Sequence, residues 1–300
     1  MSHPAPGRPV VAGVDGSEGS RRAARAAAEE AHLRNTSLHL LMALPWRSLG
    51  VVTSPAAAAD LSVALVRDAE DVLQELAADV GAGLGEDRVT WEVAERAAVD
   101  ALRDASGRAQ LLVLGCRGVG GVAGLVVGST ATAVVAAAGC PVLVLSDDTS
   151  VTVRGRRSVV VGVEGRPGDD EVLGTAFDEA ASRGTDLVAV HAWQDARLEA
   201  GYQVISPLVD WDGVRADEER VLAEALAGWR DKHPDVVVRE VVLRDRTARG
   251  LLAAALTAEL LVIGHRRRGR LSALGSTTHG VLHRAPCPLV VVPLGAATGA

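Results

Sequence analysis

Aromatic side chains are scarce in this sequence. They make up 2% of 300 residues, as five Trp, one Tyr and one Phe. The hydrophobic core therefore has to be built from Ala, Val and Leu. Proteins that hold single-stranded nucleic acids stack the bases on aromatic rings, and proteins that hold duplexes present a basic surface. The formal net charge is −7. Composition thus argues against a nucleic-acid partner.

Cysteine is also rare, with only Cys116, Cys140 and Cys287. They form no CxxC pair and no even-numbered disulfide framework, which favours a reducing compartment. The first nine residues lack a basic-then-apolar secretion signal, so we expect a cytoplasmic protein. Residues 118–145 carry no charge and resemble a membrane segment in hydropathy. These residues also hold six glycines and Pro141. A similar segment later in the chain, from Gly264 onward, is rich in arginine. We therefore expect no membrane span.

The chain contains an internal repeat of domain size. Four segments recur in order, the first two 149 residues apart and the last two 147 apart: 10–16 with 159–165, 111–115 with 260–264, 128–130 with 275–277, and 140–144 with 287–291. The second copy is therefore two residues shorter between Gly264 and Gly275. We predict a tandem duplication with domains at 7–148 and 156–295.

Each half alternates apolar runs with Ala-rich, charged stretches. The expected strands are 9–14, 37–44, 88–93, 110–115 and 141–145, then 158–163, 186–192, 236–242, 259–263 and 288–292. The expected helices of the first half are 17–34, 56–80 (ending near Gly81), 97–107 and 129–138. Continuous apolar runs are typical of parallel strands buried on both faces. We therefore predict an α/β fold of two tandem doubly wound domains, each with a five-stranded parallel sheet and about four helices. An antiparallel α+β arrangement is the weaker alternative.

A glycine-rich loop follows the fourth expected strand, from Gly115 to Thr130. In open parallel sheets, ligands bind beyond the carboxyl ends of the strands. Glycine amides and a following helix N-terminus can hold phosphate, and Ser129 and Thr130 add hydroxyl groups. The alternative is a loop that serves only as a tight turn. Asp15, at the end of the first strand, can accept hydrogen bonds from ribose or adenine, or cap the first helix, and both roles are compatible. Ser17 and Ser20 are the other candidate caps.

These features resemble the universal stress protein family over almost the whole chain. The family loop, Gly-x2-Gly-x9-Gly followed by Ser or Thr, is matched by Gly115, Gly118, Gly128 and Ser129. The segments 13–17 and 140–142 also resemble the family. The resemblance implies an adenine-nucleotide α-hydrolase-like fold and ATP binding, with or without Mg²⁺. The implied contacts are Asp15 to the nucleoside, the Ala43 backbone to adenine, and Gly115, Arg117, Gly118, Gly128, Ser129 and Thr130 to phosphate.

The resemblance also bears on assembly. In this family the last strand of the domain commonly pairs across a dimer. The two halves are therefore expected to pair with each other as a pseudo-dimer, and a homodimer of two chains is compatible with the same strand.

The second half departs from this pattern. Its candidate positions are Glu164, Gly264, Gly275, Ser276 and Thr277, but an arginine run replaces the counterpart of Gly118. Losing two charge-assisted backbone hydrogen bonds costs about 1.5–3 kcal/mol each, which weakens binding on the order of a hundredfold or more. Two interpretations stay open: the arginines grip phosphate with their side chains, or the run is a solvated loop. One dominant site, in the first half, is expected.

No catalytic motif is evident in the sequence. His279, His283 and Cys287 are spaced by four and could suggest metal ligands. However, prolines flank Cys287, and the first half has Thr132, Ala136 and Cys140 at these places. We expect structural or surface histidines and no metal.

The expected function is therefore that of an ATP-binding stress or signalling protein that acts through conformation or partners and hydrolyses ATP slowly at most. The alternatives are an enzyme of the same fold, such as a nucleotidyl transferase or electron-transfer protein, and a ligand-free dimerisation module.

Overall fold

The computed structural model describes residues 7–44, 55–118, 127–145, 158–193, 210–266 and 274–295. For residues 55–59 it describes the backbone alone. The described residues fall into two compact units, one up to residue 145 and one from residue 158. Within the described ranges, no helix is both long and apolar enough to span a membrane. The expected boundaries near 148 and 156 lie outside the described residues and stay predictions.

The first unit is built on one parallel sheet in the order β3-β2-β1-β4-β5. The strands are β1 (Val10–Val14), β2 (Leu38–Ala43), β3 (Val89–Ala94), β4 (Leu111–Gly115) and β5 (Val142–Leu145). Because β1 lies between β2 and β4, the chain leaves β1 toward one side of the sheet and later continues on the other. The carboxyl ends of β1 and β4 therefore flank the topological switch point, where ligands bind in folds of this kind.

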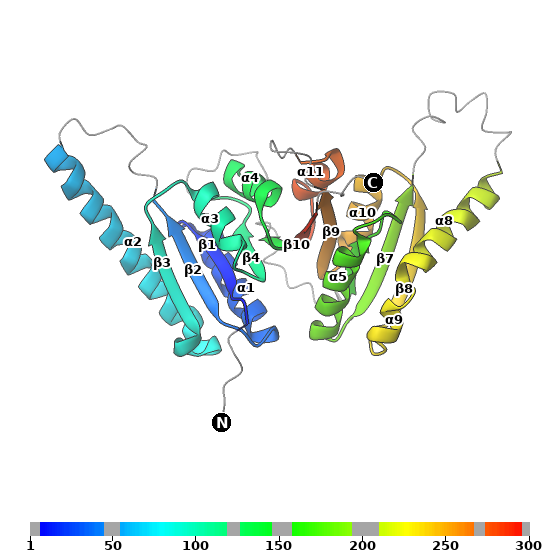
Figure 1. Cartoon of the computed structure of the whole chain (residues 1–300), viewed down its shortest axis with the longest axis horizontal. Coiled ribbons are helices and arrows are strands. Elements are labelled where there is room, and N and C mark those ends of the chain that lie inside the picture. Colours follow the sequence, from blue (N-terminus) through cyan, green and yellow to red (C-terminus); the bar gives the residue numbers. More distant parts are fainter. Residues whose placement is uncertain are drawn as a thin grey trace. The chain divides into compact units, whose positions relative to one another are not determined.

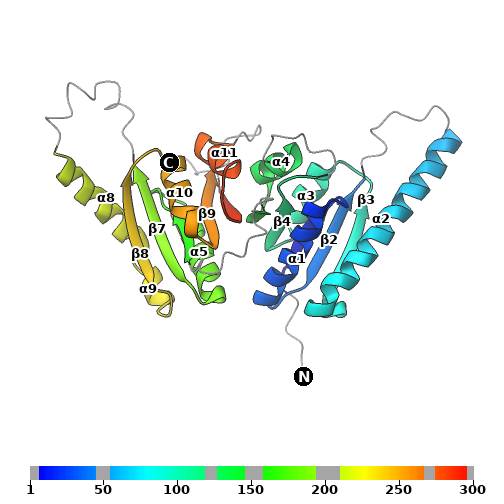
Figure 2. The ribbon, with the colours of Figure 1, turned by 180° about the vertical axis from the view of Figure 1, so that it is seen from behind.

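Four α-helices of the described residues cover this sheet: α1 (Glu18–Leu33), α2 (Pro55–Leu84), α3 (Ala98–Ser106) and α4 (Ser129–Ala137). The contacts pair α1 with α2 and α3 with α4. The second pair lies in front of the first sheet in Figure 1, and the first pair lies in front of it in Figure 2. Both faces are thus covered, as the apolar strand sequences predict.

The core consists mainly of Ala, Val and Leu, as composition predicts. Alanines at 23, 24, 27 and 31 of α1 are fully buried against the sheet. Their small side chains let the helix backbone come close to the strands. The closest approach is at Gly115, where an added β-carbon would lie 2.9 Å from the backbone of Gly19. Glycine at the end of β4 is therefore required by packing as well as by any ligand.

The predicted end of the second helix near Gly81 is wrong. Helix α2 continues to Leu84 and ends where Gly85 takes φ 104°. Only glycine adopts this backbone conformation without strain. Gly81 lies inside the helix, where an added β-carbon would make only an ordinary contact, 3.5 Å from Cα of Glu86 in the short 3₁₀ helix η2 (Glu86–Arg88). Of the three glycines at 81, 83 and 85, the last one ends the helix.

The second unit repeats the arrangement, in the order β8-β7-β6-β9-β10 with parallel pairing throughout. Its strands are β6 (Ser158–Gly162), β7 (Asp186–Trp193), β8 (Val238–Arg244), β9 (Leu260–Arg266) and β10 (Leu289–Leu294). Its helices are α5 (Asp169–Arg183), α8 (Trp211–Leu226), α9 (Trp229–Lys232), α10 (Thr247–Ala254) and α11 (Ser276–Leu282), with a 3₁₀ turn η5 (Ala255–Thr257). The fold class predicted from sequence is confirmed.

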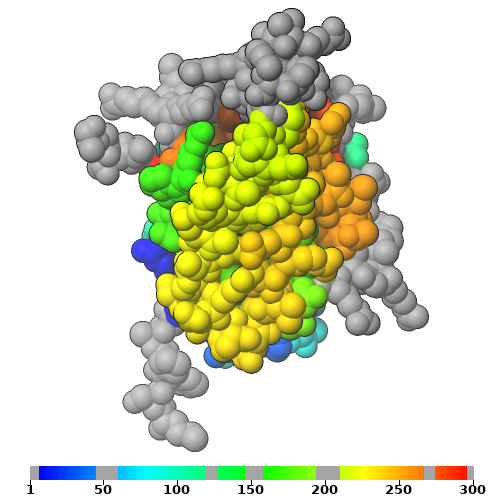
Figure 3. Space-filling model, turned by 90° about the vertical axis from the view of Figure 1, so that its right-hand side faces the viewer, coloured from blue at the N-terminus to red at the C-terminus, as the bar shows by residue number. Residues whose placement is uncertain are grey.

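Five of the seven aromatic residues belong to the second half of the sequence. Phe177 of α5 is fully buried and stacks on Trp229 of α9, with ring centroids 5.8 Å apart. Trp193 and Trp211 stack at 6.3 Å where β7 ends and α8 begins. The scarce large side chains thus attach α8 and α9 to the rest of the unit. These two helices form much of the face turned to the viewer in Figure 3.

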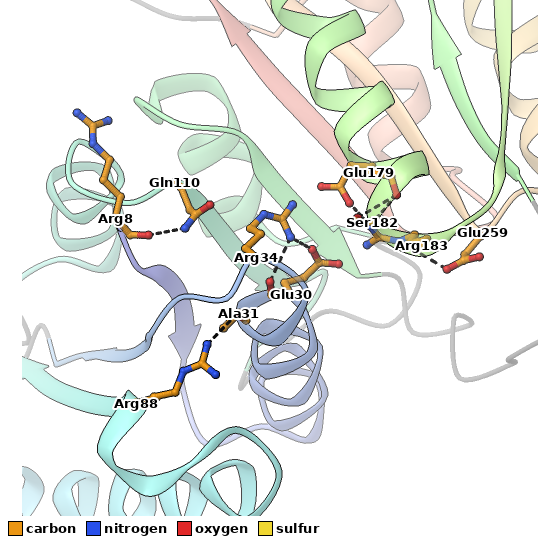
Figure 4. A network of polar contacts seen from close by, with 10 residues as sticks. All are labelled: Arg8, Glu30, Ala31, Arg34, Arg88, Gln110, Glu179, Ser182, Arg183 and Glu259. Atoms are coloured by element: carbon orange, nitrogen blue, oxygen red, sulfur yellow. Dashed lines mark hydrogen bonds and ion pairs between the residues drawn. The ribbon is translucent and has the colours of Figure 1, made fainter. Parts of the chain in front are cut away.

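Side-chain detail also reflects the duplication. In the first unit, the nearly buried Glu30 carboxylate pairs with Arg34 one helical turn on. In the second unit, Glu179 and Arg183 repeat this pair, and Arg183 also reaches Glu259 at 3.5 Å (Figure 4). Each glutamate and each arginine is 149 residues from its counterpart. A buried carboxylate needs such a partner to offset the loss of hydration.

Candidate functional site

The turn after β1 brings Asp15 to the carboxyl edge of the sheet. Ser17 donates its backbone N–H (3.0 Å) and its hydroxyl (2.6 Å) to Oδ1 of Asp15. Ser17 is also the N-cap of α1, because its Oγ accepts the amide of Ser20 at 3.2 Å. The capping role that was one option for Asp15 therefore belongs to Ser17. The Asp15 side chain is exposed at this edge.

Gly118 lies directly against Asp15. A β-carbon on Gly118 would overlap with Oδ2 of this carboxylate. With Asp15 in this position, a larger residue at 118 would require the exposed carboxylate to turn away from Ser17. The structure thus brings together two residues that are 103 positions apart and that the sequence predicted for one site.

The two ends of the glycine loop are tied together. The Gly128 amide donates to the Cys116 carbonyl at 2.7 Å, and the Cys116 amide donates to the Leu145 carbonyl at 2.8 Å. Residues 119–126 lie outside the described residues. Both flanks, Gly115 to Gly118 and Gly128 to Thr130, are therefore anchored at the end of β4, with Arg117 half-buried between Cys116 and Gly118.

Helix α4 begins at this point. Its N-cap is Gly128, which has no side chain to bond the first-turn amides. The first amides of a helix have no acceptor within the helix, and together they favour an anion. Ser129 and Thr130 are exposed in this first turn. The helix start thus offers amide donors and two hydroxyls on the carboxyl side of the sheet.

Ala43 is the last residue of β2 and is half-buried, in register with Ala94 of β3. It ends at the same edge as Asp15, one strand away from β1. The described residues therefore gather all the positions predicted for the first half along the ends of β2, β1 and β4. Sequence reasoning did not foresee Gly19, whose backbone lies close to Gly115.

The second half places its counterparts differently. Glu164 follows β6 and faces Arg266, with Oε2 3.8 Å from Nε, and Arg266 also donates to the Pro167 carbonyl at 2.7 Å. Gly264 lies within β9, where its β-carbon would lie 2.9 Å from Val172. Arg267, Arg268 and Arg270 lie outside the described residues.

The second helix start does repeat the first. Gly275 caps α11 as Gly128 caps α4, without a side-chain hydrogen bond. Ser276 and Thr277 therefore occupy the positions of Ser129 and Thr130.

One residue of the second half was missed from sequence. Oδ2 of Asp169 accepts the backbone amides of residues 164, 165 and 166 at 3.1, 2.6 and 3.0 Å. Asp169 is 7% exposed. Burial raises the pKa of its carboxyl group, and the three amide hydrogen bonds act in the opposite direction. The signal was its alignment with Ser20, 149 residues earlier.

The histidines with metal-like spacing lie on or beside α11. The rings of His279 and His283 are 4.5 Å apart, and burial lowers the pKa of His283, helped by nearby His279 and Arg284. Cys287 is fully buried. In the part of the chain that the structure describes, no group of three or more His, Cys, Asp or Glu side chains could hold a metal ion.

Comparisons with known proteins agree with this architecture. A sequence profile of the universal stress protein family matches residues 7–146 and 155–293. The chain is 36% identical over 307 residues to "Universal stress protein Rv2005c" of Mycobacterium tuberculosis, covering 97% of this chain and 99% of that protein. It is 34% identical over 293 residues to "Universal stress protein Rv2623" of the same species, covering 94% and 95%.

Solved structures show the same fold. A universal stress protein from Archaeoglobus fulgidus has a TM-score of 0.67 at 19% identity, covering 95% of this chain and 98% of that one. A putative universal stress protein from Pseudomonas aeruginosa has a TM-score of 0.57 at 16% identity, covering 96% and 93%. Both likenesses extend over the two units. The profile matches two tandem regions and the relatives span the full chain, so the chain belongs to the universal stress protein family.

Proposed function

We propose that the first half of this chain binds an adenine nucleotide, ATP in particular, between the ends of β1 and β4. The observation that carries the proposal is the contact of Gly118 with Asp15 beside the uncapped start of α4. It puts a carboxylate acceptor and a set of amide donors at one switch point. A nucleotide needs both, because its sugar hydroxyls donate hydrogen bonds and its phosphates accept them.

Different residues of the site would contact the phosphates, the ribose and the adenine. The first-turn amides of α4, the hydroxyls of Ser129 and Thr130, and the loop backbone at Gly115 and Gly118 serve the phosphates. The Asp15 carboxylate serves the ribose, and Ser17 holds it in place through two hydrogen bonds. The backbone at the end of β2, at Ala43, serves the adenine edge. Arg117 and a Mg²⁺ ion carried by ATP would supply positive charge near the phosphates.

Membership of the family supports a role in stress response, and members are not generally classed as enzymes. We propose that the nucleotide acts as a signal whose binding changes the conformation or the partners of this cytoplasmic protein. ATP hydrolysis is expected to be slow at most, because no residue of the proposed site is assigned the role of catalytic base. Pairing of the two halves with each other and pairing of two chains are both predictions. Sedimentation of the purified protein with and without ATP tests the pairing of two chains.

Isothermal titration calorimetry with ATP, AMP and cyclic AMP tests the proposal, with and without Mg²⁺. Wild-type protein should bind ATP, and Gly118→Arg should abolish binding because the side chain fills the space beside Asp15. Gly83→Arg is the matched control, because a β-carbon on Gly83 has no neighbour within 4 Å. No binding by wild type, or equal binding by Gly118→Arg, would refute the site.

A further inference from the structure

The backbone turn after β6 has the geometry of an anion-binding site, and the carboxylate of Asp169 lies in it. Three consecutive amides, at residues 164, 165 and 166, point at one oxygen, Oδ2 of Asp169. Gly165 takes φ 70°, the left-handed conformation that lets successive amides converge. Concave sets of backbone N–H groups of this kind bind phosphates and other anions. Asp169 is nearly buried, so its carboxylate is largely shielded from solvent while it accepts these three amides.

The first half has no such internal anion. At the corresponding place Ser20 offers a hydroxyl, which accepts the amide of Asp15 at 3.3 Å and donates to the Ser17 carbonyl at 2.9 Å. The Asp15 carboxylate bonds Ser17 beside it rather than the three amides together. The neutral hydroxyl leaves this turn without the additional negative charge that Asp169 brings to the second half.

Packing closes the second turn further. A β-carbon on Gly165 would overlap with Val221 of α8, whereas one on Gly16, its counterpart, has nothing within 4 Å. At the end of β7 the hydroxyl of Thr247 donates to the Ala192 carbonyl at 3.4 Å, and Ala192 corresponds to Ala43. Arg266 faces Glu164. Groups that would meet a nucleotide in the first half are satisfied within the protein in the second.

We propose that the turn at residues 164–166 is an anion-binding nest whose resident ligand is the Asp169 carboxylate, and that this occupancy keeps phosphate away from the carboxyl edge of β6. The ligand class is a small oxyanion, carboxylate or phosphate. The second clause rests on the proposed function, because it concerns the edge that corresponds to the proposed nucleotide site of the first half. The first clause concerns this chain's own residues and holds without any nucleotide.

Chemical rescue in the full-length protein tests the nest. Asp169→Ala removes the carboxylate and leaves three amides unpaired, which lowers the melting temperature by roughly 5 °C or more. Formate or inorganic phosphate, titrated at constant ionic strength, should enter the vacated space. The melting temperature of the variant should then rise with anion concentration well beyond any change in wild type. Glu171→Ala is the matched control, because it removes an exposed acid from the same helical turn and should show no rescue.

A second variant covers the case in which Asp169→Ala does not fold. Asp169→Ser keeps a small hydroxyl acceptor, as Ser20 provides in the first half, but removes the charge and leaves room beside it. It should be less stable than wild type and gain more from formate. An equal response of wild type, both Asp169 variants and Glu171→Ala to formate and phosphate would overturn the proposal. All arms omit nucleotide, so a failure here is distinct from a failure of ATP to bind wild-type protein.

Discussion

Gly118 and Asp15 face each other across the switch point of the first sheet, so closely that a β-carbon on the glycine would overlap with Oδ2 of the acid. The contact joins the loop after β4 to the turn after β1. It explains the glycine by the position of a carboxylate rather than by backbone conformation, since Gly118 does not have positive φ. The pair therefore marks a place where the chain keeps a charged acceptor beside the backbone of the glycine loop.

A single methyl group should disturb this contact. Gly118→Ala forces the exposed Asp15 carboxylate to rotate away from Ser17. The rotation breaks the two hydrogen bonds that hold the carboxylate in place for the ribose, and hydrogen bonds to a charged group contribute about 1.5–3 kcal/mol each. We expect the affinity for ATP to fall about tenfold or more, measured by calorimetry. Gly83→Ala, at an exposed position in the last turn of α2, should leave the affinity unchanged. Equal affinities for the two variants would show that the contact does not shape the site.

Two serines of the proposed site should differ in what they contribute to stability. Ser17→Ala removes the N-cap of α1, which costs about 1 kcal/mol of unfolding free energy. Ser129→Ala removes an exposed hydroxyl at the start of α4 and should lower ATP affinity with little effect on stability. Urea denaturation and calorimetry on both variants measure the two effects. A loss of stability in Ser129→Ala as large as that in Ser17→Ala would count against this division of roles.

The three cysteines should be chemically inert in the native protein. All are buried, and burial raises the pKa of the Cys140 thiol to about 12. The thiolate is the reactive form, so iodoacetamide at pH 8 should label none of them until urea unfolds the chain. Mass spectrometry of the intact protein reads the number of labels. Rapid native labelling of Cys140 would contradict its placement.

One pH effect follows from the first unit. Arg96 donates to Asp104 at 2.5 Å, and this hydrogen bond lowers the pKa of Asp104 below its ordinary value. A lowered pKa in the folded state contributes stability above the unfolded pKa, and that contribution is lost as pH falls through the folded pKa. Arg96→Gln should raise the pKa of Asp104 toward its ordinary value, as read by NMR of the carboxyl carbon. An unchanged titration would exclude the pair.

Strand positions could be predicted from the sequence because apolar runs and buried parallel strands coincide. Each expected strand of the first half agrees with the structure to within about one residue at either end. The end of α2 could not be predicted, because the sequence alone does not distinguish Gly81, Gly83 and Gly85. Only Gly85 has the positive φ that ends the helix.

The site was predictable in part for the same reason. The spacing of Gly115, Gly118 and Gly128 identified the loop, but not that Gly118 meets a side chain 103 residues earlier. Asp169 was not predicted because its role depends on turn geometry: three amides converge on one oxygen in a turn where Gly165 is left-handed. Aligning the halves pairs it with Ser20, and that change in charge was the overlooked clue.

The central claim is that one chain holds one adenine nucleotide, in its first half. Native mass spectrometry of the purified full-length protein with excess ATP measures this directly, with Gly118→Arg and Gly83→Arg alongside. The account predicts one nucleotide per chain for wild type and Gly83→Arg, and none for Gly118→Arg. Two nucleotides per wild-type chain, or one retained by Gly118→Arg, would contradict it.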